Sequence, residues 1–380
     1  MRFQLNFLTV IPVYKMHRIA YFITPHGFGH AARASAVMDA VRITFPSVSF
    51  DIFTTVPKWF FDDSLLGRFT YHEFPSDVGL LQKTPFSHDL EETIERLDRF
   101  LPFNPALLSE TADFLKRRAC RLVVCDIASI GISIAAEAGI PSVLIENFTW
   151  DWIYEDFIYD NAHMGRHVDF LRKIYRAADY HIQASPVCNP QKTNMTTVPI
   201  SRQVRVSCLR VREALGVSPE KKMVLLTTGG VQEKYRFLES LTSQPEICFV
   251  VPGGSDRPER HDNLILLPHR SNFFHPDLVN AANAVVGKAG YSTIAEVYQA
   301  GVPFGYVPRS NFRETAKLVA FIEKEMKGLC ISIEDFKAGK WLRNIFQLLN
   351  LQLTQRFDRN GSYQAAAIIT DLVKQEQNLR

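Results

Sequence analysis

Short apolar runs alternate with longer amphipathic stretches along most of the chain. In the first half the apolar runs have the length of buried strands, and two of the stretches between them have the pattern of helices. The predicted strands are residues 18–24, 48–55, 122–126, 142–147 and 180–184, and the predicted helices are 31–43 and 130–138. Strands that alternate with helices predict α/β units around a parallel sheet.

A second series of the same kind follows a change in composition. Residues 185–207 contain three prolines among polar side chains and have little apolar periodicity, which predicts a linker. After it come predicted strands at 223–227, 247–251, 263–267, 284–286, 303–307 and 329–331, and predicted helices at 231–241, 276–282, 293–300, 313–327 and 362–375. We expect two Rossmann-like α/β domains that face each other across a cleft, with ligand-binding loops at the carboxyl ends of their strands.

The predicted domains are residues 17–198 and 199–355, and residues 356–380 are expected to form a C-terminal helix that packs back towards the first domain. The length of 380 residues agrees with two domains. The first 16 residues include an apolar stretch without a convincing cleavage site, so we expect translation to start at Met16 and a signal peptide to be absent.

The composition narrows the class of protein. With 46% hydrophobic and 22% charged residues, the chain has the composition of an ordinary globular protein. Its net charge of only +3 gives no indication of a nucleic-acid-binding surface. No apolar run reaches the length of a membrane span. The six cysteines are scattered without metal-ligand spacing, which indicates free thiols in a reducing compartment, a cytoplasmic location and no zinc site.

The first candidate for chemistry is the loop Gly27-x-Gly29-His30-x-x-Arg33, which follows a predicted strand and opens a predicted helix. Glycines allow close backbone approach, and a helix N-terminus favours negative charge. The alternative is a tight turn in which His30 is only a polar cap. His26 precedes this loop and is expected to form a wall of the site.

The second candidate is the segment from Gly287 to Glu296, which also joins a predicted strand to a predicted helix. Backbone N–H groups at the helix start, with the hydroxyls of Ser292 and Thr293, suit a diphosphate, and Glu296 is placed to accept hydrogen bonds from a ribose. The alternative is a capping box formed by Thr293 and Glu296. Gly229 and Gly230, after the strand at 223–227, form a third strand–glycine–helix turn of this type.

These motifs together resemble GT-B glycosyltransferases. The similarity is carried by residues 26–33, 286–296 and 301–309, and it covers most of the chain from His17. It is closest to glycosyltransferase family 28, which includes the N-acetylglucosaminyltransferase of peptidoglycan lipid intermediates, and to the glycosyltransferase-like N-terminal half of plant-type arabinokinases. Residues 147–154 resemble the arabinokinase group specifically.

The resemblance implies roles for individual residues. It makes His30 the general base and Asp126 the carboxylate that orients it; the alternative for Asp126 is the N-cap of the following helix. On the donor side it implies a ribose contact for Glu296 and sugar contacts for Arg309 and Glu314, although many relatives carry an Asp-Gln or Asn-Gln pair near the latter two. The residues expected around the diphosphate are Gly229, Gly230, Gly287, Lys288, Gly290, Ser292 and Thr293.

Other residues on the acceptor side have two interpretations. Arg33 either braces the loop against a carboxylate or touches ligand, and Trp150 either lines an acceptor pocket or belongs to the core. Trp59, Phe60 and Phe61 form either a core segment or an apolar patch for peripheral membrane contact.

The leading hypothesis is an inverting glycosyltransferase that uses neither a metal nor a cofactor. No Asp-x-Asp pair, the usual holder of a divalent metal at a diphosphate, occurs in the chain. The substrates would be a nucleotide-diphosphate sugar, with UDP favoured by the resemblance, and an acceptor that is a sugar, a lipid-linked molecule or a small molecule. The alternatives are a non-catalytic sugar-nucleotide-binding protein and, ranked last, a nucleotide-sugar epimerase.

Overall fold

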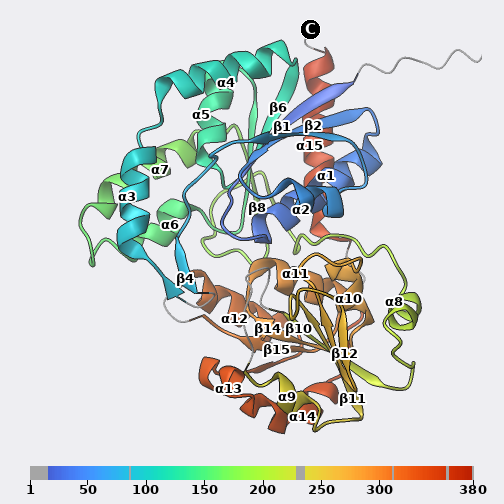
Figure 1. Ribbon diagram of the computed structural model, residues 1–380. Helices are drawn as coiled ribbons and strands as arrows, with labels where there is room; N and C mark the ends of the chain where they lie inside the picture. The colour runs from blue at the N-terminus through green and yellow to red at the C-terminus, as the bar shows by residue number, and fades with distance from the viewer. Residues whose placement is uncertain (1–15, 85–86, 228–235, 310–311, 357–358, 379–380) are drawn as a thin grey trace, which may run out of the picture.

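Two seven-stranded sheets, one above the other in Figure 1, organise the chain. The structure is a computed structural model that describes residues 16–84, 87–227, 236–309, 312–356 and 359–378. Helices cover the sheets, and the two sheets form the cores of two α/β domains (Figure 1). Among the described residues, no helix has both the length and the apolar character needed to cross a bilayer.

The first sheet is parallel throughout and has the strand order β3-β2-β1-β6-β7-β8-β9. Its strands are β1 (His17–Ile23), β2 (Val48–Thr54), β3 (Phe69–Glu73), β6 (Cys120–Asp126), β7 (Ser142–Glu146), β8 (Tyr180–Ala184) and β9 (Met195–Thr197). The helices of this half are α1 (Gly29–Thr44), α2 (Lys58–Ser64), α3 (Leu90–Phe100), α4 (Pro105–Arg117), α5 (Ser129–Ala138), α6 (Trp150–Glu155) and α7 (Met164–Arg176). A short antiparallel pair, β4 (Gln82–Thr84) and β5 (Ser87–His88), lies outside this sheet.

The second sheet has the order β12-β13-β11-β10-β14-β15-β16, and only its β12–β13 pair is antiparallel. Its strands are β10 (Lys222–Thr227), β11 (Ile247–Pro252), β12 (Glu259–His261), β13 (Leu264–Leu267), β14 (Ala284–Lys288), β15 (Phe304–Val307) and β16 (Gly328–Cys330). The accompanying helices are α8 (Cys208–Ala214), α9 (Leu238–Leu241), α10 (His275–Ala281), α11 (Tyr291–Ala300), α12 (Glu314–Glu325), α13 (Ile333–Lys337), the 3-10 helix η1 (Lys340–Asn344) and α14 (Ile345–Leu349).

The strand order explains where a site can form. In each sheet the chain builds outwards from a central strand, first to one side and then to the other, so the order reverses between β1 and β6 and between β10 and β14. Ligands bind outside the carboxyl ends of the strands at such reversal points, because the flanking helices leave in opposite directions there. Both reversal points lie next to the glycine loops that the sequence singles out.

The last helix, α15 (Gly361–Asn378), returns from the second domain to the first and packs against α1 (Figure 1). Ala365, Ala366 and Ile369 are buried in the same apolar cluster as the α1 alanines. Small side chains on α1 allow this close helix contact. Tyr291 and Ala295 of α11 join the cluster from the second domain, so one apolar core connects the two domains.

The central strands agree with the predictions to within a few residues. The predicted helix at 231–241 is longer than the helix that the structure shows in the described part of this range. There, only Leu238–Leu241 is helical, and residues 231–235 lie outside the described residues. The short elements of the first domain, including β3, α2, α3 and α4, were not predicted. The predicted linker contains one further strand, β9.

Candidate active site

His30 and Asp126 meet at the reversal point of the first sheet. Ile23, the last residue of β1, pairs with Asp126, the last residue of β6, so the loop after β1 lies beside the end of β6. His30 is in the first turn of α1, and its Nδ1 lies 2.8 Å from Oδ1 of Asp126. Both side chains are buried. The N-cap alternatives are wrong, because Phe28 caps α1 and Ala128 caps α5.

The surroundings of His30 select one tautomer. Nη2 of Arg33 lies 3.1 Å from Nδ1 of His30, but a guanidinium can only donate. If Nδ1 were unprotonated, its lone pair would face a carboxylate oxygen at 2.8 Å. Nδ1 therefore donates to Asp126, and Nε2 is free to accept a proton from a ligand. Burial lowers the pKa of His30, partly offset by Asp126, so the ring is neutral near pH 7.

Arg33 holds the Asp126 carboxylate from one side. Its Nε donates to Oδ2 at 2.8 Å and its Nη2 to Oδ1 at 2.7 Å, while Nη1 donates to Oδ1 of Asn147 at 2.6 Å. The guanidinium also lies 4.7 Å from the centre of the Tyr291 ring. Burial alone would raise the pKa of Asp126, but the charge of Arg33 and the hydrogen bonds from His30 and Arg33 lower it. The bracing interpretation of Arg33 fits these contacts.

The network crosses to the second domain. Nδ2 of Asn147 donates to Oε1 of Glu314 at 2.8 Å, so His30, Asp126, Arg33, Asn147 and Glu314 form one connected chain. Glu314 begins α12 and is buried. Such a chain fixes the position of His30 relative to the second domain.

A small cavity of about 80 Å³ lies beside this network. From the first domain it is lined by residues of the glycine–histidine loop, including His26, Gly27, Gly29, His30 and Arg33, together with Gln82, Asn147 and Phe148. From the second domain it is lined by Lys288, Gly290, Ser292, Thr293, Arg309, Phe312 and Glu314, among others. Gly27 has a φ of +67°, which favours glycine and turns the chain from β1 into α1.

The N-terminus of α11 points to the junction with a second, larger cavity. Gly290 is the N-cap, and no described side chain caps the helix there. Ser292 and Thr293 line both cavities. Uncapped N–H groups at the start of a helix favour an anion. The capping-box alternative is wrong, because the Glu296 carboxylate is bound to other side chains.

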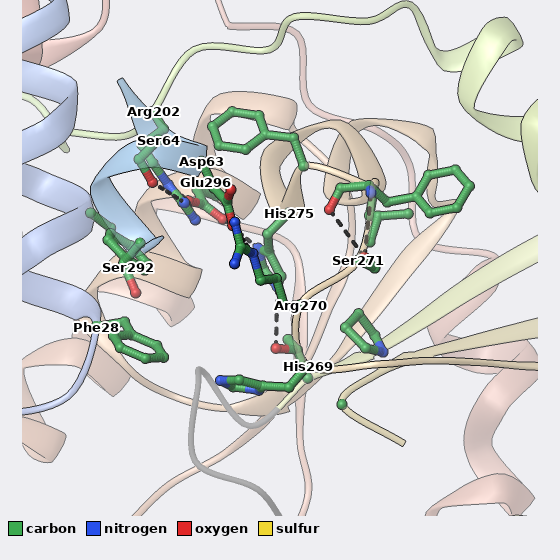
Figure 2. A pocket seen from close by; sticks show the side chains of 18 of the residues that line it. Phe28, Asp63, Ser64, Arg202, His269, Arg270, Ser271, His275, Ser292 and Glu296 are labelled. Atoms are coloured by element: carbon green, nitrogen blue, oxygen red, sulfur yellow. Dashed lines mark hydrogen bonds and ion pairs between the residues drawn. The ribbon is translucent and has the colours of Figure 1, made fainter. Parts of the chain in front are cut away.

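The larger cavity has a volume of about 340 Å³. Phe28, Trp59 and Phe60 line it from the first domain. His269 lines it from the second domain, and its ring lies beside that of Phe28 (Figure 2). Glu296 lies at its floor beside Arg202 and His275. An apolar wall with a few fixed polar groups is typical of a small-molecule site.

Two basic side chains hold Glu296. Arg202 donates to Oε1 through Nη2 at 2.9 Å and through Nε at 3.1 Å, and Nδ1 of His275 lies 2.7 Å from Oε2. Burial would raise the pKa of Glu296, but Arg202 and His275 lower it. The carboxylate is therefore charged and already accepts three of the roughly four hydrogen bonds that its lone pairs allow. One position remains for a ligand hydroxyl.

Some predicted site residues lie elsewhere. Gly287 is inside β14 and lines neither cavity; a Cβ there would lie 1.9 Å from the carbonyl oxygen of Thr227, so the glycine serves strand packing. Trp150 is fully buried against His26 and Tyr154 and lines neither cavity, so the core interpretation holds. Gly229 and Gly230 lie outside the described residues.

The apolar segment after β2 is not a membrane patch. Phe60 and Phe61 are buried, and Trp59 lines the larger cavity. The sequence reasoning also missed Arg202, His275 and Asn147. Asn147 directly follows the buried strand β7, which was a usable signal, whereas nothing local in the linker marks Arg202.

The fold is the GT-B fold of glycosyltransferases. Over 95% of this chain, the calicheamicin glycosyltransferase CalG4 superposes with a TM-score of 0.57 at 14% identity, covering 95% of that chain. A UDP-glucosyltransferase from Polygonum tinctorium gives 0.58 at 14% identity, with 95% and 99% covered. A transferase from Siraitia grosvenorii in complex with UDP gives 0.55 at 13% identity, with 94% and 99% covered. At these identities the likeness establishes the fold.

A sequence relative is more specific. The chain is 27% identical over 358 residues to an L-arabinokinase of Arabidopsis thaliana. The match covers 93% of this chain and 34% of the arabinokinase, so the chain spans about a third of that relative. No family model matches the chain. The predicted resemblance to the GT-B fold and to an arabinokinase is confirmed.

Proposed function

We propose that the protein is an inverting, metal-independent glycosyltransferase that transfers a sugar from a nucleotide-diphosphate sugar to an acceptor hydroxyl. One observation carries the proposal: His30, oriented by Asp126, and the N-terminus of α11 line the same small cavity from opposite domains. A base and an anion site on facing sides of one cavity are what such a transfer requires.

In the proposed reaction the acceptor hydroxyl gives its proton to Nε2 of His30. Its oxygen forms a bond to the anomeric carbon of the donor from the face opposite the diphosphate, and the bond from that carbon to the diphosphate oxygen breaks. The negative charge that develops on the leaving diphosphate lies at the N-terminus of α11, next to Ser292, Thr293 and Lys288.

The larger cavity is proposed to bind the nucleoside. Its size and aromatic wall suit a base and a ribose, and Glu296 has one acceptor position left for a ribose hydroxyl. Uridine is the favoured nucleoside, because related folds include a transferase described in complex with UDP. The acceptor would enter next to His26 and Gln82, whose Nε2 atoms lie 3.3 Å apart at the small cavity.

A second candidate is a protein that binds a sugar nucleotide without transferring the sugar. The observation in its favour is that both carboxylates already have partners within the protein. Arg33 donates hydrogen bonds to both oxygens of Asp126. Arg202 and His275 bind the carboxylate of Glu296. A carboxylate shared with a guanidinium supports imidazolium formation less than a free one.

The decisive experiment compares binding and turnover in matched variants. The wild-type protein is screened by thermal shift against nucleotide sugars; a ligand at 100 times its Kd adds about 2.7 kcal/mol to the free energy of unfolding. Release of the nucleoside diphosphate is then measured with a panel of acceptors. In His30→Ala we expect donor binding to persist while turnover falls by about 10²–10⁴-fold, the contribution of a positioned base.

The control is His261→Ala, which removes an exposed histidine of the edge strand β12 that lines neither cavity. It should bind and turn over like the wild type. Turnover that is unchanged in His30→Ala rejects the catalytic role. Binding with no turnover by the wild type, across all acceptors, favours the second candidate.

A further inference from the structure

Two basic side chains, Lys288 and Arg309, line the small cavity and form no ion pair with a described residue. Lys288 ends β14, and Arg309 follows the neighbouring strand β15, so the parallel pairing brings them to one edge of the second sheet. Within the described part of the chain, neither the ammonium nor the guanidinium has a hydrogen bond or an ion pair. Arg309 instead stacks on Phe312, with 3.7 Å between its guanidinium carbon and the ring centre.

The charges of the described residues around the cavity do not balance. Arg33 and Asp126 form a neutral pair. Glu314, on the same cavity, offsets one of the two remaining cations, which leaves one positive charge. Burial and then the like charge of Arg309 lower the pKa of Lys288 to about 8, so the pair of cations is costly without an anion. A positive charge kept at such a cost indicates an anionic ligand.

The position along the cleft tells which part of a donor meets these cations. Ser292 and Thr293 line both cavities and mark the junction where the diphosphate is proposed to lie. Lys288 and Arg309 line the small cavity and not the larger one. With the nucleoside in the larger cavity, Lys288 lies beside the diphosphate, and Arg309 faces the sugar beyond it.

We propose that the sugar bound in the small cavity is a uronate, a sugar whose terminal carbon is a carboxylate, with Arg309 as the residue that recognises it. This inference rests on the proposed function, because it assumes a nucleotide sugar in the cleft. The planar guanidinium matches a carboxylate with two parallel hydrogen bonds, and its ring contact with Phe312 holds the plane in place.

The test compares UDP-glucuronate with UDP-glucose, which differ only in a carboxylate in place of a hydroxymethyl group, and with UDP itself. Calorimetric titration of the wild-type protein should show that UDP-glucuronate binds at least about tenfold more tightly than UDP-glucose, as charge-assisted hydrogen bonds imply. In Arg309→Gln this preference should disappear while the affinity for UDP stays the same. The control is Lys317→Gln, which removes an exposed cation of α12 and should keep the preference.

Three results overturn the inference. Equal binding of the two sugars by the wild type does so directly. An equal loss of affinity for UDP and both sugars in Arg309→Gln assigns the cation to the diphosphate instead. A wild-type protein that binds none of the three refutes the proposed nucleotide-sugar site itself, and so separates that failure from the other two.

Discussion

Arg33 is the side chain whose removal tests the site network most directly. The guanidinium is buried, with 1% of the residue exposed, and it supplies two of the three hydrogen bonds to the fully buried carboxylate of Asp126. Arg33→Met keeps an unbranched apolar stem and removes the charged guanidinium. The carboxylate then remains buried with only His30 as a partner.

The expected cost follows from this burial. Breaking a buried ion pair by removing one partner costs about 3–5 kcal/mol, because it leaves an uncompensated charge. For a domain of this size, that corresponds to a fall in Tm of roughly 6–20 °C. The double variant Arg33→Met/Asp126→Asn should recover much of the loss, since no buried charge is left.

The loss should also depend on pH. In the wild type the pKa of Asp126 is lowered, so its contribution to stability is present above the unfolded-state pKa and is lost as the pH falls through the folded-state pKa. In Arg33→Met, burial without Arg33 raises the pKa of Asp126. Protonation then relieves the buried charge, so the difference in unfolding free energy between the two proteins should shrink as the pH falls from 7 towards 5.

Thermal and urea unfolding at several pH values measure both effects. The reasoning is refuted if Arg33→Met lies within about 1 kcal/mol of the wild type at pH 7, a cost typical of an ordinary substitution. It is equally refuted if the double variant is no more stable than the single one. Loss of the Asn147 hydrogen bond and the Tyr291 contact is common to both variants, so the comparison between them isolates the carboxylate.

Two further predictions concern strand packing and the base. Gly287→Ala should destabilise the second domain by about 3 kcal/mol, because its Cβ would lie 1.9 Å from a backbone oxygen that cannot rotate aside. Gly27→Ala, with no atom within 4 Å of its Cβ but a φ of +67°, should cost only about 1 kcal/mol in the same urea titration; a reversed order contradicts this account. The pKa of the proposed base, His30, is lowered by burial, so the decrease of kcat/KM on the acid side of the pH profile should occur below pH 6.5. Asp126→Asn should shift this decrease to lower pH, because the carboxylate that favours the imidazolium is gone and Arg33 remains; a shift to higher pH would count against the assignment.

The sequence predicted the framework of the site well. The central strands are continuous apolar runs, buried on both faces, and that pattern needs no tertiary information. A glycine loop between a strand and a helix has a single plausible place in an α/β domain, at the carboxyl edge of the sheet. His30, Lys288 and Gly290 were therefore placed correctly at an edge, although their partners were unknown.

Helices at the periphery of the first domain were harder to predict. Segments such as α3 and α4 are amphipathic and have ordinary capping residues, Asp89 and Asn104, but they lie in a stretch without the strand–helix alternation on which the prediction relied. The small strands β4 and β9 are three residues long, too short for a periodic signal.

What the chain determined alone is the alternation of buried strands and helices and the position of each loop on its own sheet, because both depend on residues close in sequence. Only the tertiary structure decided which charges meet. Arg33 binds a carboxylate 93 residues away, and Glu296 is held by Arg202, 94 residues earlier, in a linker with no local signal. Such pairs are set by strand order and by the approach of two domains, so a single sequence carries no periodic trace of them.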